Sequence, residues 1–188
     1  MYKLATQRPS MATPRHKLPI RMISTVVRGY GRGSRELGIP TANLCRETLQ
    51  SSVDFDDLPC GIYWGFAKVG SGRTPESETP VCKAAISIGY NPTYKNEQKT
   101  VEPHLIADPA DARRNASLCG ETLLRDFYGE TIRLSVVGFL RNELPFEGLE
   151  KLVAAIKKDI VDSERLCDGT DAFTRAEQEW VGSSEGVV

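Results

Sequence analysis

The sequence lacks several features that would assign a function at once. It has no apolar run of the roughly 18 residues that a membrane-spanning helix needs, so we expect no membrane segment. Lys and Arg number 24 against 25 Asp and Glu, and this missing basic excess disfavours a general nucleic-acid binder. With only two histidines, a His-rich metal site and an HxGH nucleotidyltransferase motif are both excluded.

The cysteines also argue against metal or disulfide staples. There are five, an odd number, and no CxxC pair occurs, so a zinc site of the cysteine type is not expected. Unpaired thiols favour an intracellular chain, and we expect a cytoplasmic protein. The 188 residues suffice for one domain with its own core.

Residues 1–17 read as a flexible N-terminal tail, because prolines interrupt them and no apolar period develops. No acidic residue precedes Glu36, and such a bias is typical of mitochondrial transit peptides. A mitochondrial location therefore stays open as the alternative to the cytoplasm.

Most of the remaining chain reads as short strands separated by turn residues, which favours a barrel or sandwich. The predicted strands are 20–28, 62–69, 81–88, 100–106 and 131–140.

Two helices are predicted after these strands. Apolar residues at three- and four-residue spacing indicate a first helix whose polar side carries Lys151, Lys157, Lys158 and Asp159. The residues of its apolar face are Leu149, Leu152, Val153, Ile156 and Ile160. A second helix is predicted from about Thr174, with Glu177 completing a capping box.

The segment 28–44, RGYGRGSRELGIPTANL, is the densest in features that suit phosphate binding. Glycines let backbone N–H groups converge and arginines add bidentate donors. The segment matches neither the Walker pattern nor G-x-G-x-x-G, so a wide turn between strands remains an alternative. Thr41 and Asn43 lie two apart and share a side if the chain is extended there. Their hard oxygens suit a magnesium ion, although Asn43 capping a local turn is the competing interpretation.

Further along, three positions could carry chemistry. Glu102 lies in a β-branched run and could accept a proton from an attacking hydroxyl, with His104 as a rival base and an exposed-face carboxylate as the plain alternative. The aromatics of 126–129, DFYG, fill a core or form one wall of a base-binding pocket. Arg141 and Phe146 suit a flat, phosphorylated ligand or a cap over the barrel.

Taken together, these segments resemble the riboflavin kinase family, which makes FMN from riboflavin and ATP, in its eukaryotic monofunctional type. The matching pieces are GRGSRELGIPTANL at 31–44, GIY at 61–63, SIGYNPTYKN at 87–96, VEPHLI at 101–106, DFYGE at 126–130 and VVGFLRNELPF at 136–146. The resemblance implies a mainly β fold, a six-stranded antiparallel Greek-key barrel with a C-terminal helix across one end. It places the kinase domain at 18–167 and leaves 168–188 as a C-terminal extension, partly helical or disordered.

The resemblance also assigns roles. It makes Glu102 the base that activates the ribityl 5′-hydroxyl, and Thr41 and Asn43 the ligands of Mg²⁺ or Zn²⁺. The positions implied for ATP are Gly29, Gly31, Gly33, Arg35, Leu105, Ala107 and Tyr128. The positions implied for riboflavin or FMN are Arg141, Leu144 and Phe146. Residues 107–125 form an insertion relative to the family, next to the ATP positions.

We expect a monomer whose partners are the small molecules riboflavin and ATP, with no nucleic acid and no membrane. The alternative from another class is a non-catalytic β-barrel module that binds flavin. The presence of Glu102, Thr41 and Asn43 counts against that alternative.

Overall fold

The computed structural model of the chain describes residues 17–29, 39–70, 80–90, 98–106 and 127–186. Residues 1–16 of the tail predicted at 1–17 lie outside these residues, as does the insertion at 107–125. So do Gly31, Gly33, Arg35 and Ala107, four of the predicted ATP positions.

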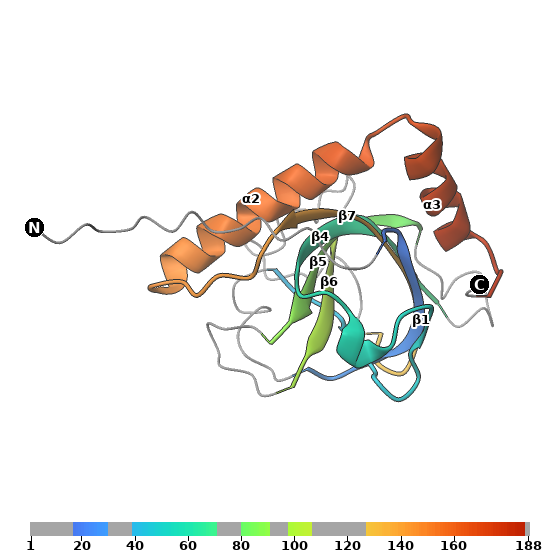
Figure 1. The fold of residues 1–188 in the computed structure, drawn as a ribbon, viewed down its shortest axis with the longest axis horizontal. Coiled ribbons are helices and arrows are strands. Elements are labelled where there is room, and N and C mark those ends of the chain that lie inside the picture. Colours follow the sequence, from blue (N-terminus) through green and yellow to red (C-terminus); the bar gives the residue numbers. More distant parts are fainter. Residues whose placement is uncertain (1–16, 30–38, 71–79, 91–97, 107–126, 187–188) are drawn as a thin grey trace, which may run out of the picture.

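The described chain forms one antiparallel sheet with two helices after it (Figure 1). The elements are β1 (Ile20–Val27), β2 (Asn43–Leu44), β3 (Gln50–Ser51), η1 (Phe55–Asp57), β4 (Gly61–Val69), β5 (Cys82–Gly89), β6 (Thr100–Ile106), β7 (Thr131–Arg141), α2 (Leu149–Cys167) and α3 (Ala172–Gly182). Each of the five predicted strands is present, with ends that differ from the prediction by no more than a residue.

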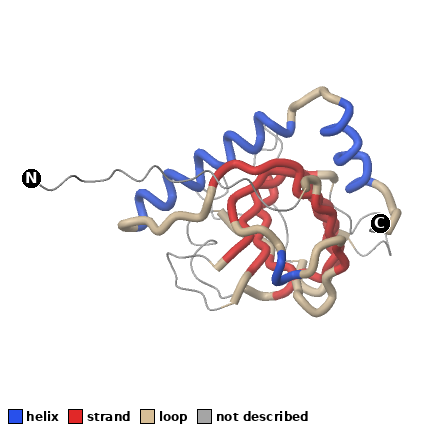
Figure 2. The backbone as a smooth tube through the Cα atoms, viewed as in Figure 1, coloured by secondary structure: helices blue, strands red, loops and turns tan. Residues whose placement is uncertain are grey.

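The sheet curls into a nearly closed barrel. Its strands follow the order β2-β1-β7-β4-β5-β6, with β3 paired to β1, and Figure 2 shows them curving around a common interior. The two ends of this path meet where the Ala42 N–H donates to the Pro103 carbonyl at 2.9 Å. The predicted mainly β barrel with a C-terminal helix is therefore confirmed.

Alternation along the strands divides the apolar side chains between two clusters. Along β4, Tyr63 and Ala67 face the barrel interior, whereas Trp64 and Phe66 belong to an outer cluster. The inner cluster also takes large buried side chains from the other strands, including Ile20, Met22, Ile86, Val101 and Leu134. The outer cluster gives the two helices an apolar wall to pack on.

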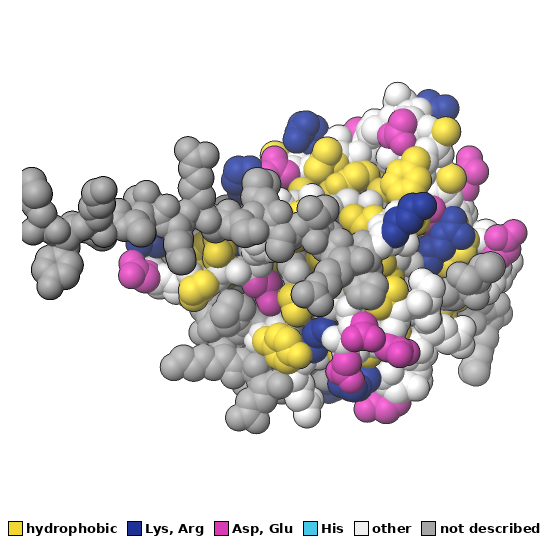
Figure 3. Space-filling model, viewed as in Figure 1, with side chains coloured by type: hydrophobic (Ala, Val, Ile, Leu, Met, Phe, Trp, Pro, Cys, Tyr) yellow, Lys and Arg dark blue, Asp and Glu magenta, His cyan; other side chains and the backbone are white. Residues whose placement is uncertain are grey.

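Helix α2 contacts β4, β5 and β7, and α3 contacts β4 and β7. Cys167, Trp180 and Val181 of the helices pack against Phe66 and Val137 in the outer cluster, so the helices cover the barrel wall from outside. Apolar side chains gather along this side of the molecule in the space-filling view (Figure 3). No helix in the described ranges is long and apolar enough to cross a membrane.

The predicted polar face of α2 is wrong at one position. Asp159 is 7% exposed, whereas Leu149, predicted on the apolar face, is 54% exposed. The carboxylate of Asp159 accepts two hydrogen bonds from Arg141, from Nε at 2.9 Å and from a terminal nitrogen at 2.6 Å. A buried acid is tolerated there because its charge is paired.

The predicted capping box of α3 is also wrong. The helix begins at Ala172, and Asp171 caps it by accepting the Thr174 N–H at 3.0 Å. Glu177 is instead buried against the barrel, where it accepts hydrogen bonds from Arg21 at 2.9 and 3.0 Å and from the Ser135 hydroxyl at 2.8 Å. A carboxylate thus ties α3 to β1 and β7.

Candidate functional site

The seam that closes the barrel brings Thr41 next to Glu102. The hydroxyl Oγ1 of Thr41 lies 3.4 Å from Glu102 Oε2, a long contact for two oxygens. On the other side of the carboxylate, Thr100 Oγ1 lies 2.8 Å from Glu102 Oε1. Glu102 is neither buried nor fully exposed, so its carboxylate is held by hydroxyls and still accessible.

Asn43 lies on the same side of its segment as Thr41. Burial alternates there, with Ala42 and Leu44 in the core and Thr41 and Asn43 facing away from it, as the spacing predicts. The backbone of Gly29 passes so close that a Cβ at this position would lie 2.3 Å from Asn43 Nδ2. A residue with a side chain could not bring the backbone this near to the Asn43 amide.

These side chains fit a hard metal ion. The hydroxyl of Thr41, the amide oxygen of Asn43 and the nearby carboxylate of Glu102 are all oxygen donors, the class that Mg²⁺ prefers. Neither a thiolate nor an imidazole belongs to the set, so the donors suit Mg²⁺ better than Zn²⁺.

His104 braces the seam. Its Nδ1 lies 2.8 Å from the Pro40 carbonyl, which can only accept, so Nδ1 carries the hydrogen. Burial lowers the pKa of His104 from the usual 6.5, and the bond to Pro40 opposes that shift. The bond from Nδ1 to Pro40 holds 40–43 against β6.

The predicted ATP residues separate into surface and core. Tyr128 is exposed, and the guanidinium of Arg28 lies 4.7 Å from the centre of its ring. This contact of a cation with an aromatic face holds Tyr128 close to Arg28, the residue before Gly29. Leu105 differs, because its side chain is 8% exposed and packs in the barrel core.

Of the predicted flavin residues, Arg141 ends β7, and Leu144 and Phe146 lie on the loop between β7 and α2. Arg141 is held by Asp159, and its guanidinium also lies 5.6 Å from the ring centre of Phe146. Leu144 is 53% exposed. The same loop reaches β5 through Glu143, whose Oε2 accepts the Tyr90 N–H at 3.2 Å.

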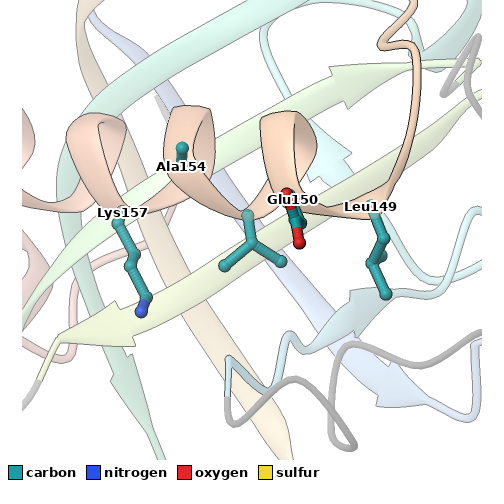
Figure 4. A pocket seen from close by; sticks show the side chains of 5 residues that line it. Leu149, Glu150, Ala154 and Lys157 are labelled. Carbon is teal, nitrogen blue, oxygen red and sulfur yellow. The ribbon is translucent and has the colours of Figure 1, made fainter.

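An open hollow begins where this loop enters α2. It is lined by Leu149, Glu150, Val153, Ala154 and Lys157, whose side chains lie along one stretch of the helix (Figure 4). Its lining is mostly aliphatic, with one acid and one base at its edge.

Several residues of this region were missed by sequence reasoning. Thr100 could have been found, because it lies two positions before Glu102 on the same strand and therefore on the same side. Asp159 and Glu143 could not, since their partners belong to other elements.

Comparison with known proteins identifies the family. The model of the family described as "Flavokinase: Riboflavin kinase" matches residues 16–167. Riboflavin kinase of Mus musculus is 37% identical over 171 residues, covering 91% of this chain and 96% of the relative. Riboflavin kinase of Homo sapiens is 40% identical over 148 residues, covering 79% and 81%.

Two further matches bear on fold and length. The bifunctional riboflavin kinase/FMN phosphatase of Arabidopsis thaliana is 38% identical, and the match covers 76% of this chain but 32% of that protein. The crystal structure of riboflavin kinase from Trypanosoma brucei has the same fold, with a TM-score of 0.58, 21% identity and coverage of 90% and 93%. The matched length and the identity to the mouse and human proteins show that the chain belongs to the riboflavin kinase family.

Proposed function

We propose that this protein transfers the γ-phosphoryl group of ATP to the 5′-hydroxyl of riboflavin, making FMN and ADP. Membership of the riboflavin kinase family supports the reaction. The observation that carries the residue assignment is the contact of Thr41 with Glu102 at the seam of the barrel, from segments about sixty positions apart, with Asn43 on the same side of its segment as Thr41.

Glu102 is the general base of the proposal. Its carboxylate accepts the proton as the ribityl O–H bond breaks and the oxygen attacks the γ-phosphorus, while ADP departs with the electrons of the broken P–O bond. Phosphoryl transfer depends chiefly on positioning and on charge stabilisation. A carboxylate held between Thr41 and Thr100 suits that demand.

Thr41 and Asn43 would hold the metal ion, for which we propose Mg²⁺. When bound, the ion supplies positive charge that stabilises the phosphate oxygens during transfer. The backbone of Gly29 lies beside the Asn43 amide, and His104 holds the segment through Pro40. These contacts hold both donors in place before the nucleotide arrives.

The remaining site residues divide between the two substrates. For ATP we propose Gly29, Gly31, Gly33, Arg35, Ala107 and Tyr128, with Leu105 contributing its backbone because its side chain is in the core. Arg28 joins them through its contact with Tyr128.

For riboflavin we propose Leu144 and Phe146, together with the aliphatic hollow at the start of α2. Arg141 was predicted as a ligand contact. Because Asp159 binds its guanidinium in a bidentate manner, the support is stronger for a role in which Arg141 anchors the loop. We place the catalytic domain at 18–167, followed by an extension that carries α3, in a monomer that acts on small molecules.

The test is conversion of riboflavin to FMN with ATP and Mg²⁺, followed by chromatography. Glu102→Gln keeps the shape but loses the base, and we expect kcat to fall by at least about 100-fold with riboflavin binding retained. Glu179→Gln, on the exposed side of α3, is the matched control and should keep the wild-type rate. Near-normal turnover by the folded Glu102→Gln variant would remove Glu102 from this role.

The metal assignment has its own test. Thr41→Val and Asn43→Leu should weaken binding of ATP with Mg²⁺ more than binding of riboflavin, as measured by calorimetry with each ligand separately. Unchanged affinity for ATP–Mg²⁺ in both variants would contradict the assignment. Flavin binding by the wild-type protein without any turnover would favour the non-catalytic module instead.

A further inference from the structure

The contact between Thr100 and Glu102 assigns a role to a residue that the reaction itself does not require. Thr100 and Gly89 pair across β5 and β6 at the end of the two strands. The hydroxyl of Thr100 lies 2.8 Å from Glu102 Oε1 and 3.3 Å from the Gly89 carbonyl. Both neighbours are acceptors, so the hydroxyl has to be the donor.

A threonine hydroxyl has one hydrogen and cannot satisfy both acceptors. The carboxylate oxygen is the nearer of the two and carries charge, which makes its hydrogen bond the stronger. The hydrogen therefore points to Oε1, and the Gly89 carbonyl is the weaker alternative. Oxygen Oε1 of Glu102 thereby accepts a hydrogen bond from Thr100 of its own strand.

The other oxygen is held much less firmly. Among the residues that the structure describes, the contact of Oε2 is the one of 3.4 Å with Thr41, whose hydroxyl we assign to the metal ion. The last torsion of a glutamate has a broad distribution, so an unanchored carboxylate would turn freely. A single strong donor on Oε1 limits that rotation and leaves Oε2 directed away from Thr100.

We propose that Thr100 is a positioning residue for the general base. By donating to Oε1 it sets the orientation of the Glu102 carboxylate, so that Oε2 is the oxygen that takes the proton of the substrate hydroxyl. This inference rests on the proposed function, because it presupposes that Glu102 is the base. Thr100 itself touches no reacting atom.

The test compares three substitutions at position 100. Thr100→Val replaces the hydroxyl by a methyl group and keeps the β-branched shape that suits a strand. Thr100→Ser keeps the donor and removes the methyl group, and Thr100→Ala provides a second variant without a donor. Thr131→Val, at the exposed start of β7, is the matched control for the same chemical change on another strand.

For Thr100→Val we expect kcat to fall about tenfold or more, the size of effect that follows from losing one hydrogen bond to a charged group. The KM values for riboflavin and ATP should stay within about twofold, because the proposed role of Thr100 acts on the base and not on substrate binding. Thr100→Ser should recover most of kcat, Thr100→Ala should resemble Thr100→Val, and Thr131→Val should resemble the wild type. Melting temperatures check that each variant is folded.

The outcomes separate this inference from the proposed function. If the wild type makes FMN and Thr100→Val keeps its kcat, Thr100 does not position the base and the inference is overturned. A loss of kcat that Thr100→Ser fails to recover would overturn it as well, since bulk and not the donor would then be responsible. A wild-type protein without turnover would refute the proposed function and the inference together. A Glu102→Gln variant with full turnover would refute the role of Glu102, and the inference with it, but not the reaction.

Discussion

Gly89 is the last residue of β5, which pairs with β6, the strand that carries Glu102. Gly89 also lies beside Glu143, on the loop that carries the predicted flavin residues Leu144 and Phe146. Its φ of +154° is one that residues with a side chain rarely adopt. A Cβ there would lie 1.9 Å from Glu143 Oε2, the atom that accepts the Tyr90 N–H. Gly89→Ala should therefore both strain the backbone and push Glu143 off its partner.

The two costs can be added. The backbone part is about 1–3 kcal/mol for a residue in a sparsely populated region. Glu143 is a flexible side chain and can move aside, so the steric part reduces to its lost hydrogen bond, about 0.5–1.5 kcal/mol. We expect Gly89→Ala to lower the free energy of unfolding by about 1.5–4.5 kcal/mol. Displacing Glu143 also frees the loop that carries Leu144 and Phe146, so the KM for riboflavin should rise while that for ATP changes little.

Urea unfolding and steady-state kinetics test both parts. Gly129→Ala is the matched control, because Gly129 also has a positive φ, +80°, but nothing lies within 4 Å of its added Cβ. Repeating Gly89→Ala in a Glu143→Ala background removes the obstacle and leaves only the strain. The stability argument is refuted if Gly89→Ala costs no more free energy of unfolding than Gly129→Ala, or if the Glu143→Ala background does not lessen that cost. An unchanged KM for riboflavin refutes the argument that Glu143 holds the loop.

Three further expectations follow from groups buried against the barrel wall or the seam. Glu177→Ala should destabilise the protein by about 3–5 kcal/mol in urea unfolding, because it leaves Arg21 without its buried partner. The control Glu179→Ala should cost far less. Equal costs would contradict the role of the Arg21–Glu177 pair in holding α3 to the barrel. Because the pKa of His104 is lowered from 6.5, the unfolded state binds more protons and stability should fall as the pH drops below about 6.5. Replacing His104 by Gln should reduce that fall between pH 7.5 and 5.5, and an identical pH dependence would show that His104 is not its source. Burial raises the pKa of Cys167 to about 12, so iodoacetamide should leave this thiol unmodified until the protein unfolds, as peptide mass spectrometry can show; rapid labelling of the folded protein would contradict its burial.

Sequence reasoning located the strands well because apolar and polar side chains alternate along them, and this alternation can be read from the sequence. The segment 100–106 is predicted and observed with the same bounds. The two-residue strands β2 and β3 were not predicted, since so short a segment has no period to detect. Their existence depends on pairing with β1, which is a property of the folded chain.

Helix faces were predicted less well, for a related reason. Periodicity shows which residues share a face of a helix but not which charges have partners elsewhere. Asp159 was predicted on the polar face of α2 and Glu177 in a capping box, and both are buried because arginines on the barrel strands reach them. The arginine of the second pair is 156 positions away, beyond any local pattern.

The candidate site was predictable as a set of residues but not as a place. The sequence put Thr41 and Asn43 on one side of their segment and Glu102 on a strand, and nothing local required these to meet. They meet because the ends of the sheet close on each other, through the Ala42 bond to Pro103 and the His104 bond to Pro40. Closing the barrel and bringing Thr41 next to Glu102 are therefore the same event.

The position of the candidate site at the closure of the barrel explains why few backbone hydrogen bonds join 40–43 to β6. Elsewhere the barrel strands pair over long registers, such as the run from Lys83 to Gly89 against β6, whereas β2 is two residues long and 40–43 meets β6 through few backbone bonds. Binding groups come most readily from segments that the sheet does not consume. The short strand β2 and the nearby Gly29 thus allow a closed barrel to carry the candidate site in its wall.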